Sequence, residues 1–150
     1  MTSRFLTELE CKLLRGQFKQ GRPLWQLLSP LLYDSELLGT TVVVPKGYVT
    51  DFASVPRLPL TYLLAGDTAH EAAAIHDWLY TAHGVGLRPV SRSEADAVFR
   101  EAISASDDKA PGFFMWLAVR VGGSGAWKAE APIQPPAVAQ ILDETAREAP

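Results

Sequence analysis

Two helix-start patterns lie close together in this chain and constrain its fold more than any other feature. Residues 68–71 (Thr-Ala-His-Glu) and 91–94 (Ser-Arg-Ser-Glu) both match the capping box, which satisfies free backbone amides at a helix N-terminus. The run 69–83 contains no Gly or Pro and is followed by Gly84 and Gly86, so we predict a helix that ends there. The second pattern predicts a helix from 92 to about 104. Because the connection is short, the two helices are expected to pack as an antiparallel hairpin.

The residues before position 67 have strand character instead. Apolar or β-branched runs are separated by Gly and Pro, and they predict strands at 5–13, 23–28, 40–44 and 48–50, with a turn at 45–47. We therefore predict an α+β protein, in which N-terminal antiparallel β segments pack on a C-terminal antiparallel helical hairpin plus a third helix. The third helix is expected at 113–121. A single domain should span 1–128, and 129–150 should form a Pro-rich linker and a short C-terminal helix.

Composition excludes several classes of protein. The chain has 150 residues, 47% hydrophobic and 21% charged, which suits one soluble domain with its own core. Cys11 is the only cysteine, so no internal disulfide is available. The net charge is -3 and no run of Lys and Arg stands out, so we expect no nucleic-acid partner. No apolar stretch reaches the length of a membrane span, and the first residues lack a signal-peptide pattern, so synthesis in the cytoplasm is expected.

The three histidines lie within residues 70–83, and one of them has partners at meaningful spacing. His76 and Tyr80 share a face of the first predicted helix because they are four residues apart. Packing of the hairpin would bring Asp96 of the second helix to that face. A carboxylate there fixes the imidazole tautomer, and His76 would then take a proton from water as a general base. Asp77, on the adjacent face, is a candidate ligand for a hard cation such as calcium.

Other interpretations of this cluster remain open. The same residues would equally form a buried hydrogen-bond network that fixes one helix against the other. Arg92 and Arg100 lie four residues on either side of Asp96, which would suit a ladder of surface ion pairs. A non-catalytic metal site is a further alternative. Zinc is disfavoured, because Cys11 is alone and His76 and His83 would stand about 10 Å apart along the helix.

The spacing resembles that of phospholipase A2, most closely its short prokaryotic and parvoviral forms. The matching motifs are His-Asp-x-x-Tyr at 76–80 and Ala-Asp-x-x-Phe at 95–99. The resemblance implies that His76 is the catalytic base, that Asp77 binds calcium, and that Asp96 and Tyr80 support the histidine. That family also takes calcium ligands from a Gly-rich loop before the histidine. This chain has no Gly-x-Gly there, and Asp51 is the carboxylate that would substitute.

A second dense cluster of polar and turn residues occupies positions 47–57. Gly47 suits a turn, and Asp51 and Ser54 can bond to nearby backbone amides. Arg57 is expected to pair with Asp51 or with a carboxylate of the helical half. This pattern predicts a structured loop held by its own polar groups. A nucleophilic pair of Ser54 with His76 is an alternative, although Ser54 lacks the context of a nucleophile elbow.

Four blocks of the sequence together resemble a phage and prophage family of unknown function numbered 1353. The blocks are Gly-Tyr-Val-Thr-Asp-Phe-Ala-Ser-Val-Pro-Arg at 47–57, Ala-Ile-His-Asp-Trp-Leu-Tyr at 74–80, 91–99, and Val-Arg-Val-Gly at 119–122 with Trp127. The resemblance implies a tailed-phage origin and no established activity. We expect a non-enzymatic virion- or tail-associated component that binds other phage proteins. The alternatives are a calcium-dependent phospholipase A2-like hydrolase that acts on membrane phospholipid of the host envelope, and a small host-directed factor that binds a bacterial protein.

Overall fold

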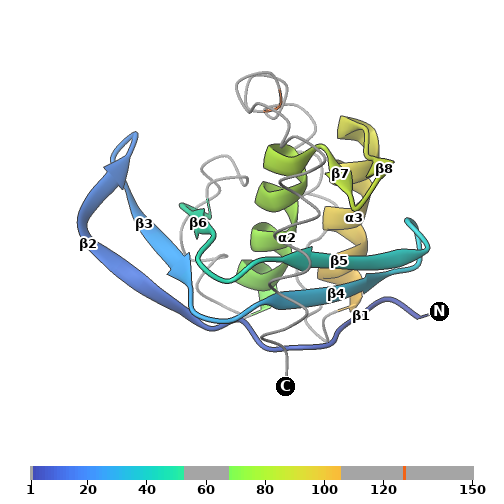
Figure 1. The fold of residues 1–150 in the computed structure, drawn as a ribbon, viewed down its shortest axis with the longest axis horizontal. Helices are drawn as coiled ribbons and strands as arrows, with labels where there is room; N and C mark the ends of the chain where they lie inside the picture. The colour runs from blue at the N-terminus through green and yellow to red at the C-terminus, as the bar shows by residue number, and fades with distance from the viewer. Residues whose placement is uncertain (1, 53–67, 106–126, 128–150) are drawn as a thin grey trace.

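The computed structural model describes residues 2–52, 68–105 and 127, and within them strands precede helices (Figure 1). The strands are β1 (Arg4–Phe5), β2 (Cys11–Lys19), β3 (Arg22–Leu27), β4 (Leu31–Ser35), β5 (Thr40–Val44) and β6 (Val49–Thr50). They are followed by α2 (Thr68–Ala82), a hairpin of β7 (Gly84–Val85) and β8 (Arg88–Pro89), and α3 (Arg92–Ala105). The predicted α+β class is confirmed. The predicted helices at 113–121 and in the 129–150 tail lie outside the described residues.

One antiparallel sheet, in the order β1-β4-β5, packs against both helices (Figure 1). Along β4, buried and half-buried residues alternate, as expected for a strand with one face on a core. The buried face of this sheet meets apolar side chains of α2 and α3, which form one core. The largest fully buried side chains of that core are Tyr33, Phe99, Leu27, Leu31, Ile75, Leu79, His76, Val42, Val44 and Val98.

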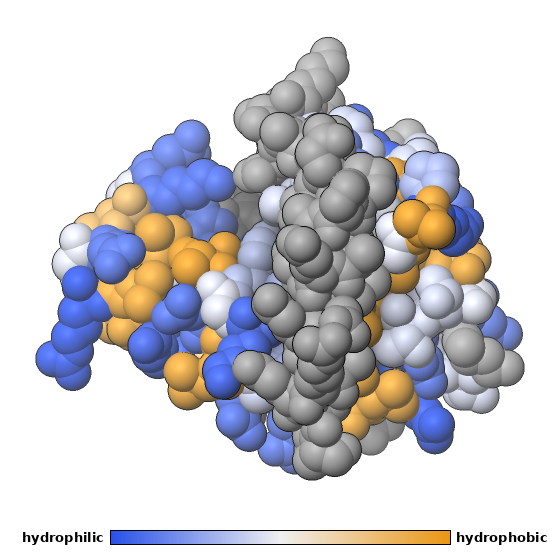
Figure 2. Space-filling model, viewed as in Figure 1, coloured by the Kyte–Doolittle hydropathy of each residue, from blue (hydrophilic) through white to orange (hydrophobic). Residues whose placement is uncertain are grey.

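The second sheet, in the order β2-β3-β6, extends away from the helices (Figure 1). The β2–β3 hairpin is mostly exposed, and Figure 2 shows hydrophobic side chains on its surface. Phe18 is 65% exposed and Leu13 is 42% exposed. The register of β2 against β3 shifts between Leu14 and Phe18, where Gly16 has a φ of +76°. A bulge of this kind bends a strand and increases its twist.

The predicted strand at 5–13 is divided in the structure. After β1, the Thr7 hydroxyl donates to the Pro30 carbonyl and accepts from the Leu32 amide, so a side chain replaces the backbone ladder. The Leu9 amide then donates to Glu71 of α2. The chain thereby leaves the first sheet and enters the second as β2. The strand β4 was not predicted, because its alternation is short and ends on the polar residues Asp34 and Ser35.

The helix boundaries agree with the predictions to within one residue, but the helix stop differs in detail. His83, and not Gly84, takes the left-handed conformation after α2, with a φ of +51°. Gly84 is required for a different reason, because a Cβ there would lie 2.9 Å from the Arg88 carbonyl oxygen. At α3, Ser91 Oγ accepts from the Glu94 amide and Glu94 accepts from the Ser91 amide, so this capping box is confirmed. Within the described residues, neither helix is long and apolar enough to cross a membrane.

Candidate functional site

The helix pair brings His76, Tyr80 and Asp96 into direct contact, as the spacing predicts. His76 Nε2 lies 3.0 Å from Asp96 Oδ1, and the Tyr80 hydroxyl donates to the same oxygen over 2.6 Å. Arg92, one turn before Asp96 on α3, places its Nε 3.7 Å from Oδ2. Both oxygens of the Asp96 carboxylate are therefore faced by donors. We call these four residues the α2–α3 cluster.

Three members of the α2–α3 cluster lie in the interior of the protein, and the Arg92 side chain is 22% exposed. His76 and Asp96 are both 0% exposed, and Tyr80 is 4% exposed. The His76 ring packs against Phe99 at a centroid distance of 5.0 Å and against Tyr80 at 4.2 Å. The interpretation of Asp96 as a member of a surface ion-pair ladder is wrong. Its i,i+4 contact with Arg92 exists, but the carboxylate itself is enclosed.

Burial decides the protonation state of the imidazole. Removal from water lowers the pKa of His76, and this effect outweighs the nearby Asp96 carboxylate, which favours the charged form. The Tyr80 pKa is raised, first by burial and then by its hydrogen bond to Asp96, so the phenol stays protonated and donates. A neutral His76 facing an ionised Asp96 carries its proton on Nε2. Its Nδ1 is then an acceptor, and it has no hydrogen-bond partner among the residues that the structure describes.

Asp77 makes a different set of contacts from its neighbour His76. Its Oδ2 accepts from the Thr50 hydroxyl, which ties α2 to β6. One turn later the Thr81 hydroxyl donates to the Asp77 carbonyl and bonds to the Tyr48 hydroxyl. Asp77 thus anchors the start of the loop that follows β6.

The predicted calcium ligands do not complete a metal site within the described residues. Calcium takes six to eight oxygen ligands, usually several of them carboxylates. In the part of the chain that the structure describes, no group of three or more His, Cys, Asp or Glu side chains is arranged so that it could hold a metal ion. Asp51 is half-buried at the end of β6, and an ion at Asp77 would have to replace the hydrogen bond from Thr50. These residues alone do not fit a calcium ion.

The 47–57 loop is only partly described. Gly47 has a φ of +84°, which the predicted turn requires and which glycine adopts without strain. The Thr50 hydroxyl accepts from the Phe52 amide, so the described part of this loop is held by its own polar groups. Ser54 and Arg57 lie outside the described residues, and so does the alternative of a Ser54–His76 pair.

The other two histidines have partners that sequence reasoning missed. His83 stacks on Trp127, with a centroid distance of 3.8 Å and an interplanar angle of 6°. Trp127 also meets the Tyr80 ring edge-on at 5.1 Å, and His83 Nε2 is buried without a hydrogen-bond partner. His70 packs edge-on against Phe52 at 5.3 Å. These contacts join residues far apart in the sequence, so no local pattern could have indicated them.

Glu101 lies at the centre of a hydrogen-bond network that the sequence did not indicate. Its Oε1 accepts from the Ser3 hydroxyl and the Leu37 amide, and its Oε2 accepts from the hydroxyls of Tyr33 and Ser35. This carboxylate of α3 therefore binds the N-terminal segment and the turn between β4 and β5. A surface glutamate in a helical pattern gives no sign of such a role.

Comparison with known proteins gives one match. The sequence model of a family described as "Protein of unknown function (DUF1353)" matches residues 25–119 of the chain. No curated protein and no solved structure matches. The matched region contains most of the described fold, including the α2–α3 cluster.

Proposed function

Since the chain belongs to the DUF1353 family of proteins of unknown function, we propose that it is a phage- or prophage-encoded, non-enzymatic protein that associates with the virion or tail. The proposal that the protein is not an enzyme rests on one observation, which is that the α2–α3 cluster is enclosed. His76 and Asp96 are both 0% exposed and are bonded to each other. Apart from His76 Nδ1, which has no hydrogen-bond partner among the described residues, the polar groups of this pair are bonded, and a buried polar network rigidifies and specifies a helix pair, which is a structural role.

The projecting β2–β3 hairpin supports a role in binding a partner. Residues 11–33 contain no Asp or Glu, and the hairpin carries Lys12, Arg15, Lys19 and Arg22, although the whole chain has a net charge of -3. Exposed Phe18 and Leu13 lie among these cations. Exposed apolar side chains within a charged rim are typical of protein interaction sites. We infer that the hairpin is the surface that contacts acidic phage proteins.

The association is tested on particles from the strain that carries this gene. Particles purified through a density gradient should contain the chain in a fixed ratio to the major tail or capsid proteins, measured by quantitative mass spectrometry. A double variant, Phe18→Ser with Arg15→Glu, should be lost from particles, because it removes the apolar and cationic contacts without touching the core. A wild-type chain that stays in the particle-free lysate would contradict the proposal.

One observation favours a second candidate, the calcium-dependent phospholipase A2-like hydrolase. Within the described part of the chain, His76 Nδ1 is a buried acceptor without a partner, and a purely structural histidine would usually satisfy both nitrogens. A water molecule bound there could give its proton to Nδ1 while Asp96 stabilises the imidazolium. In such a hydrolase, His76 Nδ1 is the general base.

An assay on phospholipid vesicles tests for this hydrolase activity. If it holds, the purified chain releases fatty acid in millimolar calcium, and His76→Gln lowers the rate by about 100-fold or more, the usual contribution of a general base. His83→Gln is the matched control, because it removes a second histidine, directly after α2, that also has a buried ring nitrogen without a hydrogen-bond partner among the described residues. No release from wild-type protein excludes the hydrolase. An equal loss in both variants would indicate damage to the fold.

A further inference from the structure

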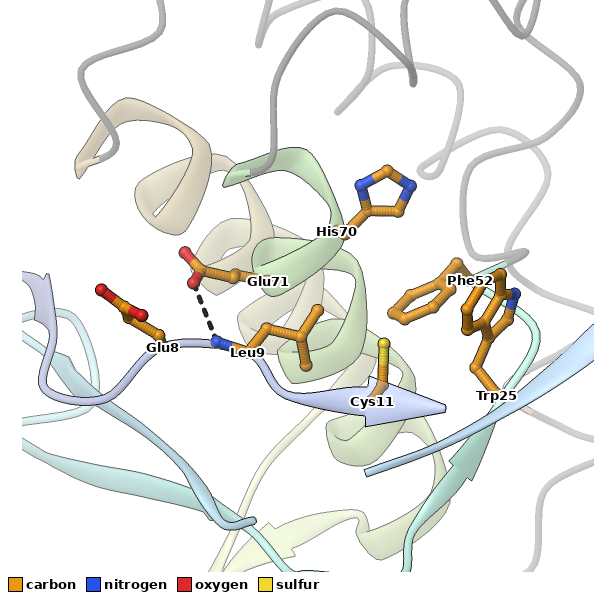
Figure 3. A pocket seen from close by; sticks show the side chains of 7 residues that line it. All are labelled: Glu8, Leu9, Cys11, Trp25, Phe52, His70 and Glu71. Carbon is orange, nitrogen blue, oxygen red and sulfur yellow. Dashed lines mark hydrogen bonds between the residues drawn. The ribbon is translucent and has the colours of Figure 1, made fainter. Parts of the chain in front are cut away.

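A cavity of about 630 Å³ lies between the N-terminal segment, the second sheet and the start of α2. It is distinct from the α2–α3 cluster, since none of its lining residues belongs to that cluster. Its volume is in the range of cavities that hold small organic ligands. The described residues that line it are Glu8, Leu9, Cys11, Trp25, Phe52, His70 and Glu71 (Figure 3).

The apolar end of the cavity is built from aromatic rings. Trp25 and Phe52 stand together on one side in Figure 3, with ring centroids 6.3 Å apart, and His70 meets Phe52 edge-on. Phe52 has a φ of +52°, a left-handed conformation that is rare for a bulky residue. Its amide is held by the Thr50 hydroxyl. Backbone strain of this kind gathers at ligand sites, and here it places an aromatic ring on the cavity wall.

The opposite end of the cavity is acidic. Glu8 and Glu71 lie across from the aromatic rings, with Leu9 and Cys11 between the two ends (Figure 3). Glu71 Oε1 accepts from the Leu9 amide over 3.1 Å, which fixes the carboxylate at the helix start. Cys11 adds no negative charge, because burial raises its pKa and keeps the thiol protonated. None of the described lining residues is Lys or Arg.

From this arrangement we propose that the cavity binds an organic cation with an aromatic or branched apolar body, its ammonium group beside Glu8 and Glu71 and its apolar part against Trp25 and Phe52. Carboxylates attract an ammonium group, and aromatic faces attract both the apolar body and the cation. An anionic ligand would meet two carboxylates and, among the described lining residues, no compensating cation. The site therefore discriminates by charge among ligands of the same shape.

Three small molecules of one shape test this preference by isothermal titration calorimetry at neutral pH. The probe 3-phenylpropylamine is cationic, 3-phenylpropanol is neutral and 3-phenylpropionate is anionic. The amine should bind with a dissociation constant of about 1 mM or tighter, the alcohol more weakly, and the acid not measurably. Failure of the amine to bind, or binding of the acid as tightly as the amine, overturns the proposal.

Matched variants locate the ammonium group. Glu8→Gln should weaken amine binding by about two- to fivefold, the range of one exposed ion pair. Glu71→Gln, in which the amide oxygen can still accept from Leu9, should weaken it by at least as much. Glu10→Gln is the control, since Glu10 is exposed two residues from Glu8 and does not line the cavity. Equal affinity in all three variants overturns the placement of the cation.

Cys11 supplies an independent readout because it is the only cysteine of the chain and lines the cavity. At an amine concentration ten times the dissociation constant, occupancy should slow N-ethylmaleimide labelling of Cys11 about tenfold. The anionic analogue at the same concentration should leave the labelling rate unchanged. Binding without protection of Cys11 would place the amine elsewhere and overturn the assignment to this cavity. None of these readouts depends on particle association, so the two proposals fail separately.

Discussion

Replacing Asp96 with alanine should lower the free energy of unfolding by about 2–6 kcal/mol, because it leaves two buried donors without an acceptor, at about 1–3 kcal/mol each. The substitution leaves the Tyr80 hydroxyl and His76 Nε2 without their acceptor inside the protein. It also removes the charge that faces Arg92. Chemical denaturation followed by circular dichroism measures the loss. For a domain of this size, the loss would be a large part of the total free energy of unfolding.

Two further variants test whether the loss of stability is specific to the Asp96 carboxylate or would follow from any substitution in this fold. Glu36→Ala removes an exposed carboxylate and should change stability by less than about 0.5 kcal/mol. Tyr80→Phe removes a single donor, and in a double-mutant cycle with Asp96→Ala it should show a clear coupling energy, because the two groups share one hydrogen bond. A loss below about 1 kcal/mol for Asp96→Ala, or the absence of coupling, would show that the network does not hold the helix pair.

The α2–α3 cluster was predictable because its information is local. A spacing of four residues fixes His76 and Tyr80 on one helix face, and the two capping-box patterns predict where the helices begin. A short connection then leaves few ways to pack the second helix. The structure confirms the contact of His76 and Tyr80 with Asp96. Sequence alone did not establish how deeply the cluster is enclosed, because burial depends on everything that packs around it.

The strands β3 and β6 of the second sheet were predicted, but the full length of β2 and the cavity were not, for a related reason. The bulge near Gly16 interrupts the alternation of β2, so the period-two pattern fails where the strand is most exposed. The cavity joins Glu8, Trp25 and His70, which come from three separate segments. No spacing in the sequence links His70 to the other two. Only the course of the chain between the two sheets places it opposite Cys11 and beside Phe52.

Glu101 is the clearest case of a long-range role, and its removal is the second large effect that we expect. Its carboxylate accepts four hydrogen bonds, from residues 64 to 98 positions away in the sequence. Tyr33 and Ser35, two of the donors, are both 0% exposed. Burial, and then the Glu101 charge, raise the Tyr33 pKa, so its phenol remains a donor. Hydrogen bonds to a charged group contribute more than neutral ones, and here they fix α3 to the first sheet.

Glu101→Ala should therefore lower the free energy of unfolding by about 3 kcal/mol, since it leaves two buried hydroxyls and the Leu37 amide without their acceptor. Glu94→Ala is the matched control on the same helix. Glu94 is an exposed capping residue, so its loss should amount to about 1 kcal/mol. Hydrogen exchange should locate the effect of Glu101→Ala in the turn between β4 and β5, where the Leu37 amide loses protection. Equal losses for the two glutamates would mean that the carboxylate of Glu101 does not join α3 to the sheet, and that apolar packing alone holds that interface.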